Sequence, residues 1–205
     1  RVQAGNMGHL PWDPKASEPV RWAFNAAVFT PLIKFNKEYK LIPGIIKSWF
    51  WNENDKSYSL TIDTSLNFGN SRKLTVEDVE FAILKPFLSK YEVKERQPLL
   101  NIVGVNKLKP GDRFKSGMCD GIKIISSKEI KIFLEGNDST FLYSLGVSVP
   151  PVGPVEAFKN DMYTFKDFPI GTGKYKIDKI KKETGEILLS RKIPFEISSL
   201  NGPPN

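Results

Sequence analysis

The sequence predicts a mixed α/β protein, and three kinds of stretch carry this prediction. Residues 57–63 alternate strictly between apolar and polar side chains, as a half-buried β-strand requires. Residues 74–83 begin with a capping sequence and continue with apolar residues at helical spacing. Residues 121–134 and 175–190 each hold two short apolar stretches separated by a polar turn, which indicates two hairpins. Helices and antiparallel strands are therefore both expected.

The first forty residues are expected to contain a strand, an irregular loop, a helix and a second strand. Residues 1–4 form the first strand, and a loop rich in Gly and Pro follows. The helix spans residues 17–28, with Ser17 as its N-cap and three alanines in its interior. Residues 29–36 form the next strand.

The helix that follows residue 74 has the clearest start signal in the chain. Thr75 is the expected N-cap, and Asp78, three residues later, can return a hydrogen bond to it. Pro86 is expected to end the helix at about Lys85, because a proline ring disfavours the α conformation of the residue before it.

The four tryptophans have two interpretations, core packing or a stacking surface for a ligand. Trp49 and Trp51 alternate along a predicted strand, which favours core packing. Trp12 and Trp22 flank the irregular loop and the start of the first helix, where exposed aromatic residues often contact ligands. For these two residues both interpretations stay open.

The composition limits where the protein can be located and which partners it can bind. No stretch approaches the roughly 18 apolar residues of a membrane span, and the first residues lack the apolar region of a signal peptide. We therefore expect a chain that is cytosolic or that follows a removed leader. The net charge is +7, but only six of the 30 basic residues are Arg and the lysines are dispersed. A solvated Lys-rich surface without a nucleic-acid partner is the favoured interpretation, with nucleic-acid binding kept as a third hypothesis.

The Gly-Thr-Gly-Lys sequence at residues 171–174 resembles part of a phosphate-binding loop. Such a loop needs a glycine five positions before its Gly-Lys pair and a Ser or Thr after the lysine. Phe168 and Tyr175 occupy these places, and the chain continues with a strand pattern instead of a helix. Gly171 and Gly173 are therefore expected to allow backbone angles that other residues resist.

The sequence offers no catalytic constellation. His9 is the only histidine, so a site built on several histidines is excluded. Cys119 is the only cysteine, which excludes an internal disulfide, and no base is evident beside it. We expect no enzymatic activity, no catalytic residue, no bound metal and no cofactor.

A series of short motifs follows a fixed order between residues 41 and 83. They are Pro43-Gly44, Ser48-Trp49, Asn54-Asp55-Lys56, Tyr58, Asn67-Phe68-Gly69 and the helix start at residues 74–79. In order and spacing this stretch resembles solute-binding protein family 5, the extracytoplasmic oligopeptide- and dipeptide-binding proteins of ABC importers. Residues 10–14, 121–135 and 168–177 extend the resemblance, whereas Lys174 stands where the family usually has Pro.

This resemblance implies the N-terminal lobe of a periplasmic-binding-protein-like class II fold. Residues 1–40 and 156–205 would form a discontinuous lobe I core, and residues 41–155 an inserted mixed α/β subdomain. The second lobe is expected to be absent from this chain. A periplasmic or cell-surface location is implied, with the leader not present in this chain.

The resemblance also implies a function, the substrate-binding component of an ABC-type peptide importer. An extended peptide or similar small solute would bind non-covalently, pairing with protein backbone until a second lobe closes over it. The expected partners are this ligand and an ABC permease in the membrane, and the protein is expected to be a monomer. The segment after Asp13-Pro14 resembles the ligand-lining stretch of the family, which assigns Ser17, Glu18, Val20 and Trp22 to ligand binding. The alternative is a sensory or protein-interaction domain of the same fold, without transport.

Overall fold

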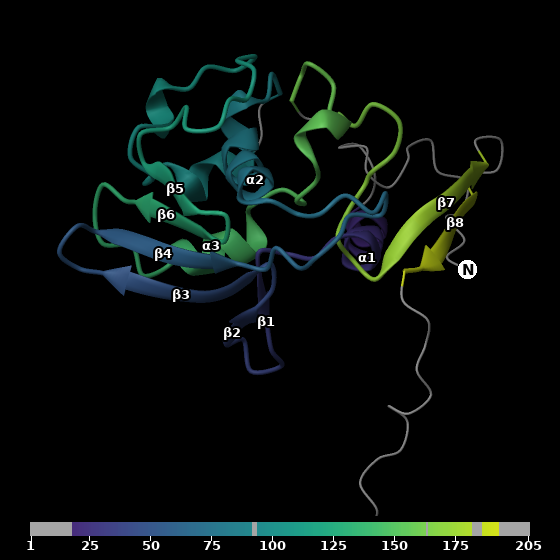
Figure 1. The fold of residues 1–205 in the computed structure, drawn as a ribbon, viewed down its shortest axis with the longest axis horizontal. Helices are drawn as coiled ribbons and strands as arrows, with labels where there is room; N and C mark the ends of the chain where they lie inside the picture. The colour runs from purple at the N-terminus through teal and green to yellow at the C-terminus, as the bar shows by residue number, and fades with distance from the viewer. Residues whose placement is uncertain (1–17, 92–93, 163, 182–185, 193–205) are drawn as a thin grey trace, which may run out of the picture.

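The computed structural model describes residues 18–91, 94–162, 164–181 and 186–192, which form helices and antiparallel sheets (Figure 1). The α-helices are α1 (Glu18–Val28), α2 (Val76–Leu88) and α3 (Phe141–Val147). The strands are β1 (Ile33–Phe35), β2 (Leu41–Pro43), β3 (Ile46–Asn52), β4 (Ser57–Ile62), β5 (Ile122–Ser126), β6 (Glu129–Phe133), β7 (Tyr175–Lys181) and β8 (Glu186–Arg191). Short 3-10 helices span Lys94–Leu99, Val105–Lys107 and Val155–Ala157. The predicted mixed α/β class is confirmed.

A four-stranded antiparallel sheet in the order β3-β4-β6-β5 forms the centre of the larger body. Tyr58, Leu60 and Ile62 of β4 are buried on one face, as their alternation predicts. Helices α2 and α3 cover this apolar face (Figure 1), and the ring of Phe141 on α3 stacks on Tyr58 at 5.6 Å. The main hydrophobic core therefore lies between the sheet and these two helices.

The prediction of core packing for Trp49 and Trp51 is confirmed. Both side chains are partly buried against the main core. The Trp51 ring lies 4.8 Å from that of Tyr58, and its indole N–H donates a hydrogen bond of 2.6 Å to Glu53. An indole packs on the core while its N–H reaches a polar partner at the edge of the sheet.

Helix α2 starts as predicted but does not end as predicted. The Thr75 backbone N–H donates to Asp78 Oδ2 at 2.9 Å, completing the capping box. The expected end at Lys85 is wrong, because the helix continues through Pro86 to Leu88. Residues 85–88 are all buried, and the Arg96 guanidinium donates two hydrogen bonds to the Pro86 carbonyl at 3.0 and 3.2 Å. Burial of the last turn offsets the hydrogen bond that proline cannot donate.

A second, smaller hydrophobic cluster joins the two ends of the described chain. It consists of Phe24, Val28 and Phe29 at the end of α1 with Ile177 and Ile187 of the β7–β8 hairpin. Figure 1 shows the hairpin lying beside α1, although more than 140 residues separate them in sequence. This cluster fixes the position of α1.

Gly171 and Gly173 allow the close contact between α1 and the β7–β8 hairpin. The prediction that they adopt backbone angles which other residues resist is wrong. Neither glycine has a positive φ angle. A Cβ at Gly171 would lie 2.1 Å from the Val28 carbonyl oxygen, and one at Gly173 would lie 2.4 Å from the Val28 carbonyl carbon. The glycines let two backbone segments approach closely, and the Gly173 N–H donates to the Val28 carbonyl at 2.8 Å.

Several predictions fall outside the described residues or stay untested. The strand at residues 1–4, the loop after it, Trp12 and Ser17 lie outside the described residues. The division into a lobe I core and an inserted subdomain stays a prediction. In the described part, the strand expected at residues 29–36 is shorter and spans only β1.

Candidate functional site

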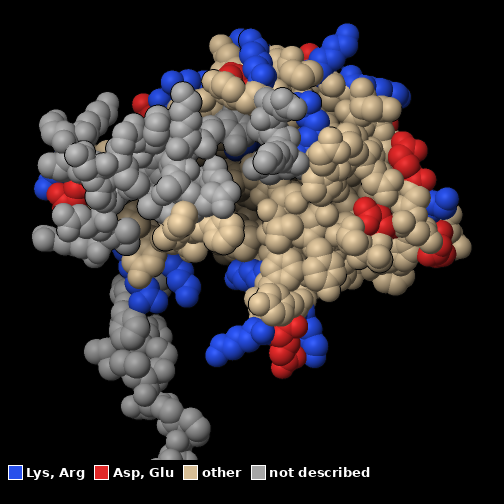
Figure 2. All heavy atoms as spheres, turned by 180° about the vertical axis from the view of Figure 1, so that it is seen from behind, with Lys and Arg blue, Asp and Glu red and all other residues tan. Residues whose placement is uncertain are grey.

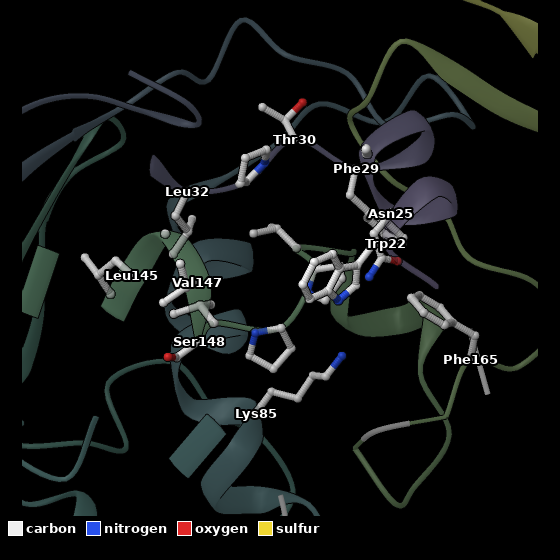
Figure 3. A pocket seen from close by; sticks show the side chains of 17 residues that line it. Trp22, Asn25, Phe29, Thr30, Leu32, Lys85, Leu145, Val147, Ser148 and Phe165 are labelled. Atoms are coloured by element: carbon white, nitrogen blue, oxygen red, sulfur yellow. The ribbon is translucent and has the colours of Figure 1, made fainter. Parts of the chain in front are cut away.

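A cavity of about 370 Å³ lies between helix α1, the end of helix α2 and the segment after helix α3 (Figure 3). This volume falls within the roughly 300–1,000 Å³ typical of small-molecule sites. Most of the lining side chains are apolar, and Asn25, Thr30, Ser148 and Lys85 supply polar groups. The cavity therefore combines an apolar wall with a few polar groups, as ligand sites usually do.

Helix α1 and the residues after it form the first wall. Trp22, Asn25 and Ala26 line the cavity from α1, at the i, i+3 and i+4 spacing of one helix face. Phe29 follows the helix, and its ring packs against Phe24 at 6.4 Å and against Phe165 at 6.3 Å. These contacts hold this wall in place through the smaller hydrophobic cluster.

The end of helix α3 and residues 149–152 form the opposite wall. Gly146 lies so close to Phe35 of β1 that a Cβ there would be 2.7 Å from the ring, which seats this end of α3 on β1. The chain then runs through Pro150 and Pro151, which have no backbone N–H to donate. Within the described part of the chain, residues 149–152 make no backbone hydrogen bond. A backbone segment that makes no backbone hydrogen bond to the other described residues thus borders the cavity.

Lys85 is the one charged residue among the described residues that line the cavity. The residue is only 4% exposed, and its Nζ lies 4.2 Å from the centre of the Phe158 ring and 5.8 Å from that of Phe165. Figure 3 shows its amino group within the ring of lining side chains, on the side of Trp22. Such cation–π contacts partly replace the water lost on burial of the ammonium group.

The residues predicted to bind the ligand have different outcomes. Trp22 lines the cavity and is 68% exposed. Glu18 and Val20 lie in α1, but the structure does not describe their side chains, and Ser17 lies outside the described residues. The binding role of all four stays a prediction.

Sequence reasoning missed Lys85 and the wall formed by residues 145–152. Lys85 carried a usable signal, because it is a charged residue among the apolar residues of α2 and directly precedes Pro86. Pro150 and Pro151 are adjacent prolines typical of an irregular connection. Their place beside α1 depends on contacts between distant segments, which no local pattern shows.

The other residues considered for catalysis or phosphate binding, Cys119 and the Gly-Thr-Gly-Lys sequence, have structural roles. Cys119 is fully buried, its thiol contacts the Val103 carbonyl at 3.4 Å, and burial raises the pKa of the thiol. Strand β7 begins directly after Lys174, so the Gly-Thr-Gly-Lys sequence does not open a helix as a phosphate-binding loop does. Among the described residues, no group of three or more His, Cys, Asp or Glu side chains is placed to hold a metal ion. No described helix is both long and apolar enough to cross a membrane.

Charged side chains are dispersed over the surface. On the face shown in Figure 2 they gather toward the edges, and a broad uncharged area of described residues lies between them. Many lysines are paired with carboxylates, for example Lys107 with Asp120 at 2.7 Å and Lys131 with Asp55 at 2.6 Å. These pairs support a solvated lysine-rich surface, and the expected absence of a nucleic-acid partner stays a prediction.

Solved structures with the same fold are binding proteins. The chain matches AgaA from A. tumefaciens R10 in complex with agropinic acid (TM-score 0.66, 16% identity, 89% of this chain, 34% of that chain). It matches the oligopeptide-binding protein AppA from Bacillus subtilis in complex with a nonapeptide (TM-score 0.64, 17% identity, 86% and 33%). It also matches NikA from Brucella suis in complex with Fe(III)-EDTA (TM-score 0.61, 22% identity, 91% and 34%). The fold is therefore that of a portion of a periplasmic solute-binding protein.

Comparison of the sequence with family models assigns the chain to one family of solute-binding proteins. The model of the bacterial extracellular solute-binding proteins, family 5 Middle, matches residues 40–192, well over half of the chain. The chain belongs to this family, a non-enzymatic, extracytoplasmic class of binding proteins, and the resemblance seen in its motifs is confirmed. A curated relative, the nickel-binding periplasmic protein of Escherichia coli (strain K12), is 22% identical over 178 residues, which cover 86% of this chain and 30% of that protein. The chain thus spans about a third of the length of the relatives it matches.

Proposed function

We propose that this chain forms one wall of the ligand site in the substrate-binding component of an ABC-type peptide importer, outside the cytoplasm. The observation that carries the proposal is the cavity between α1 and residues 145–152, where an apolar surface borders backbone that makes no backbone hydrogen bond to another described residue. Membership of a solute-binding family and the likeness to a peptide-bound neighbour support it.

An extended peptide fits the two kinds of surface in this cavity. Its backbone N–H groups can donate to carbonyl oxygens of residues 149–152, which make no backbone hydrogen bond within the described chain. Its side chains can pack on Phe29, Leu145 and Val147, and the exposed ring of Trp22 offers a stacking surface at the rim. Backbone pairing gives affinity for many sequences, because it does not depend on the side chains of the peptide.

The transport role adds two partners to this proposal. A second lobe would close over the ligand by a hinge motion, and an ABC permease in the membrane would receive it. Closure removes the ligand from water and strengthens its hydrogen bonds, so a chain with one wall alone is expected to bind in the millimolar range, about −4 kcal/mol. We further propose that the protein acts as a monomer.

Calorimetric titration of the 205-residue chain with the tripeptide Ala-Leu-Phe tests the proposed function. We expect saturable binding, weakened about tenfold by Trp22→Ala, because an aromatic contact at a site contributes roughly 1–2 kcal/mol. Phe50→Ala is the matched control, since Phe50 on β3 is 67% exposed, nearly the same as Trp22, and does not line the cavity. Absence of binding, or equal losses in the two variants, would contradict the proposal.

A further inference from the structure

Aromatic rings form one side of the cavity between α1 and residues 145–152. Trp22, Phe29 and Phe165 all line it. The ring of Phe29 stacks on that of Phe165 at 6.3 Å, with 28° between the two ring planes. Figure 3 shows these three side chains on one side of the cavity, with Leu145 and Val147 on the other. The cavity is therefore aromatic on the side of α1 and aliphatic on the side of α3.

The aromatic side is held in place by the main hydrophobic core. The ring of Phe165 lies 4.3 Å from that of Phe158, which in turn lies 5.2 Å from that of Phe81. Phe81 is fully buried in the main core, whereas Phe29 belongs to the smaller cluster. This row of rings joins the two clusters, so the aromatic surface is ordered before a ligand arrives. Binding to an ordered surface costs little conformational entropy.

Trp22 and Asn25 are the members of this side that are open to a ligand. Trp22 is 68% exposed, which is unusual for so large an aromatic residue. Asn25 lies three residues later on the same face of α1 and is partly exposed, and its side-chain amide makes no hydrogen bond to another described residue. An amide has donors and an acceptor, as a peptide group has, so it can pair with the backbone of a peptide.

The opposite side suits a flat ring. Leu145, Val147, Pro150 and Pro151 line it, and Gly146 among them has no side chain. Proline and aromatic rings pack against each other, as they do in the grooves that bind proline-rich peptides. A planar side chain in the cavity would therefore contact aromatic rings on one face and proline or aliphatic groups on the other.

We propose that this cavity selects peptides with an aromatic side chain, which inserts between Trp22 and the wall formed by residues 145–152 while Asn25 pairs with the adjacent peptide backbone. This inference rests on the proposed peptide-binding function and narrows its substrate class. Aromatic pairs attract each other beyond the area they bury, by an amount that corresponds to about two- to tenfold in affinity. An aliphatic side chain of similar size gains the burial but not this additional attraction.

Three tripeptides test this inference by NMR titration of the 205-residue chain, which detects millimolar binding. They are Ala-Phe-Ala, Ala-cyclohexylalanine-Ala, in which a saturated ring replaces the phenyl ring, and Ala-Leu-Ala. Cyclohexylalanine is more apolar than Phe, so it would bind at least as tightly if apolar burial alone mattered. We expect Ala-Phe-Ala to bind about threefold or more tightly than either of the other two.

Variants at exposed positions assign this preference to the cavity. Trp22→Leu keeps an apolar side chain without the ring and should lose most of the preference for Phe over cyclohexylalanine, whereas Trp22→Phe should keep it. Phe50→Leu is the matched control, because Phe50 is 67% exposed and does not line the cavity, and it should behave as the unmodified chain does. Asn25→Leu should weaken all three probes by the same factor, because its amide contacts the backbone that they share. Thermal melts establish that the variants are folded.

The outcomes separate this inference from the proposed function. If the three probes bind the unmodified chain equally, or if Trp22→Leu keeps the full preference, the aromatic selection by this cavity is wrong and the binding function stands. If Asn25→Leu binds as the unmodified chain does, the pairing of Asn25 with the peptide backbone is wrong. If no probe binds the unmodified chain, both the inference and the proposed function are wrong.

Discussion

Glu80 shows how one buried residue organises a distant loop. It lies on α2 with its side chain fully buried, and its carboxylate accepts hydrogen bonds from the Ser116 hydroxyl at 2.7 Å and the Gly117 N–H at 2.8 Å. Gly117 has a φ of +78°, so the loop turns in a conformation that suits glycine. Burial raises the pKa of Glu80, although the two hydrogen bonds act in the opposite direction.

This raised pKa predicts a pH dependence of stability. The folded chain binds the Glu80 proton more tightly than the unfolded chain does, so the free energy of unfolding falls as the pH rises from the unfolded pKa through the folded pKa. Glu80→Gln removes the titration and can keep both contacts. Urea unfolding at pH 5.0 and 7.5 should show the unmodified chain losing stability relative to Glu80→Gln at the higher pH. If the stability difference between the unmodified chain and Glu80→Gln is the same at both pH values, or changes in the opposite direction, Glu80 is not the source of the pH dependence.

At the scale of elements, the contact between α1 and the β7–β8 hairpin depends on close backbone approach. Gly171 and Gly173 pass against Val28 at distances that leave no space for a Cβ. The sequence predicted both the hairpin and the helix, because alternation and capping are local signals. It could not predict the true reason for the glycines, because the close approach depends on a residue about 145 positions away.

Gly173→Ala is expected to destabilise the protein by about 2 kcal/mol, because the new methyl group would overlap the Val28 backbone and force a shift of α1 or the hairpin. Gly136→Ala is the matched control, since a Cβ there meets no atom within 4 Å. Urea unfolding of both variants measures the difference. Equal stability of the two variants would rule out the close-approach explanation.

At the scale of the whole molecule, the sequence predicted the elements better than the site. The helix start at Thr75 and the hairpins follow from nearest-neighbour patterns. The cavity arises where α1, the end of α2 and residues 145–152 meet, and no local pattern encodes that meeting. Trp22 was found through a family motif, whereas Lys85 was missed because helix α2 was expected to end at this residue.

The proposed function requires the ligand to bind in the cavity between α1 and residues 145–152. Residue-resolved NMR of the ¹⁵N-labelled chain, titrated with Ala-Leu-Phe, locates the binding site. We expect the shifted amides to cluster at Asn25, Phe29, Gly146, Val147 and Val149, on the two walls of the cavity. Shifts confined to the β3-β4-β6-β5 sheet, or no shifts at millimolar peptide, would contradict the proposed function.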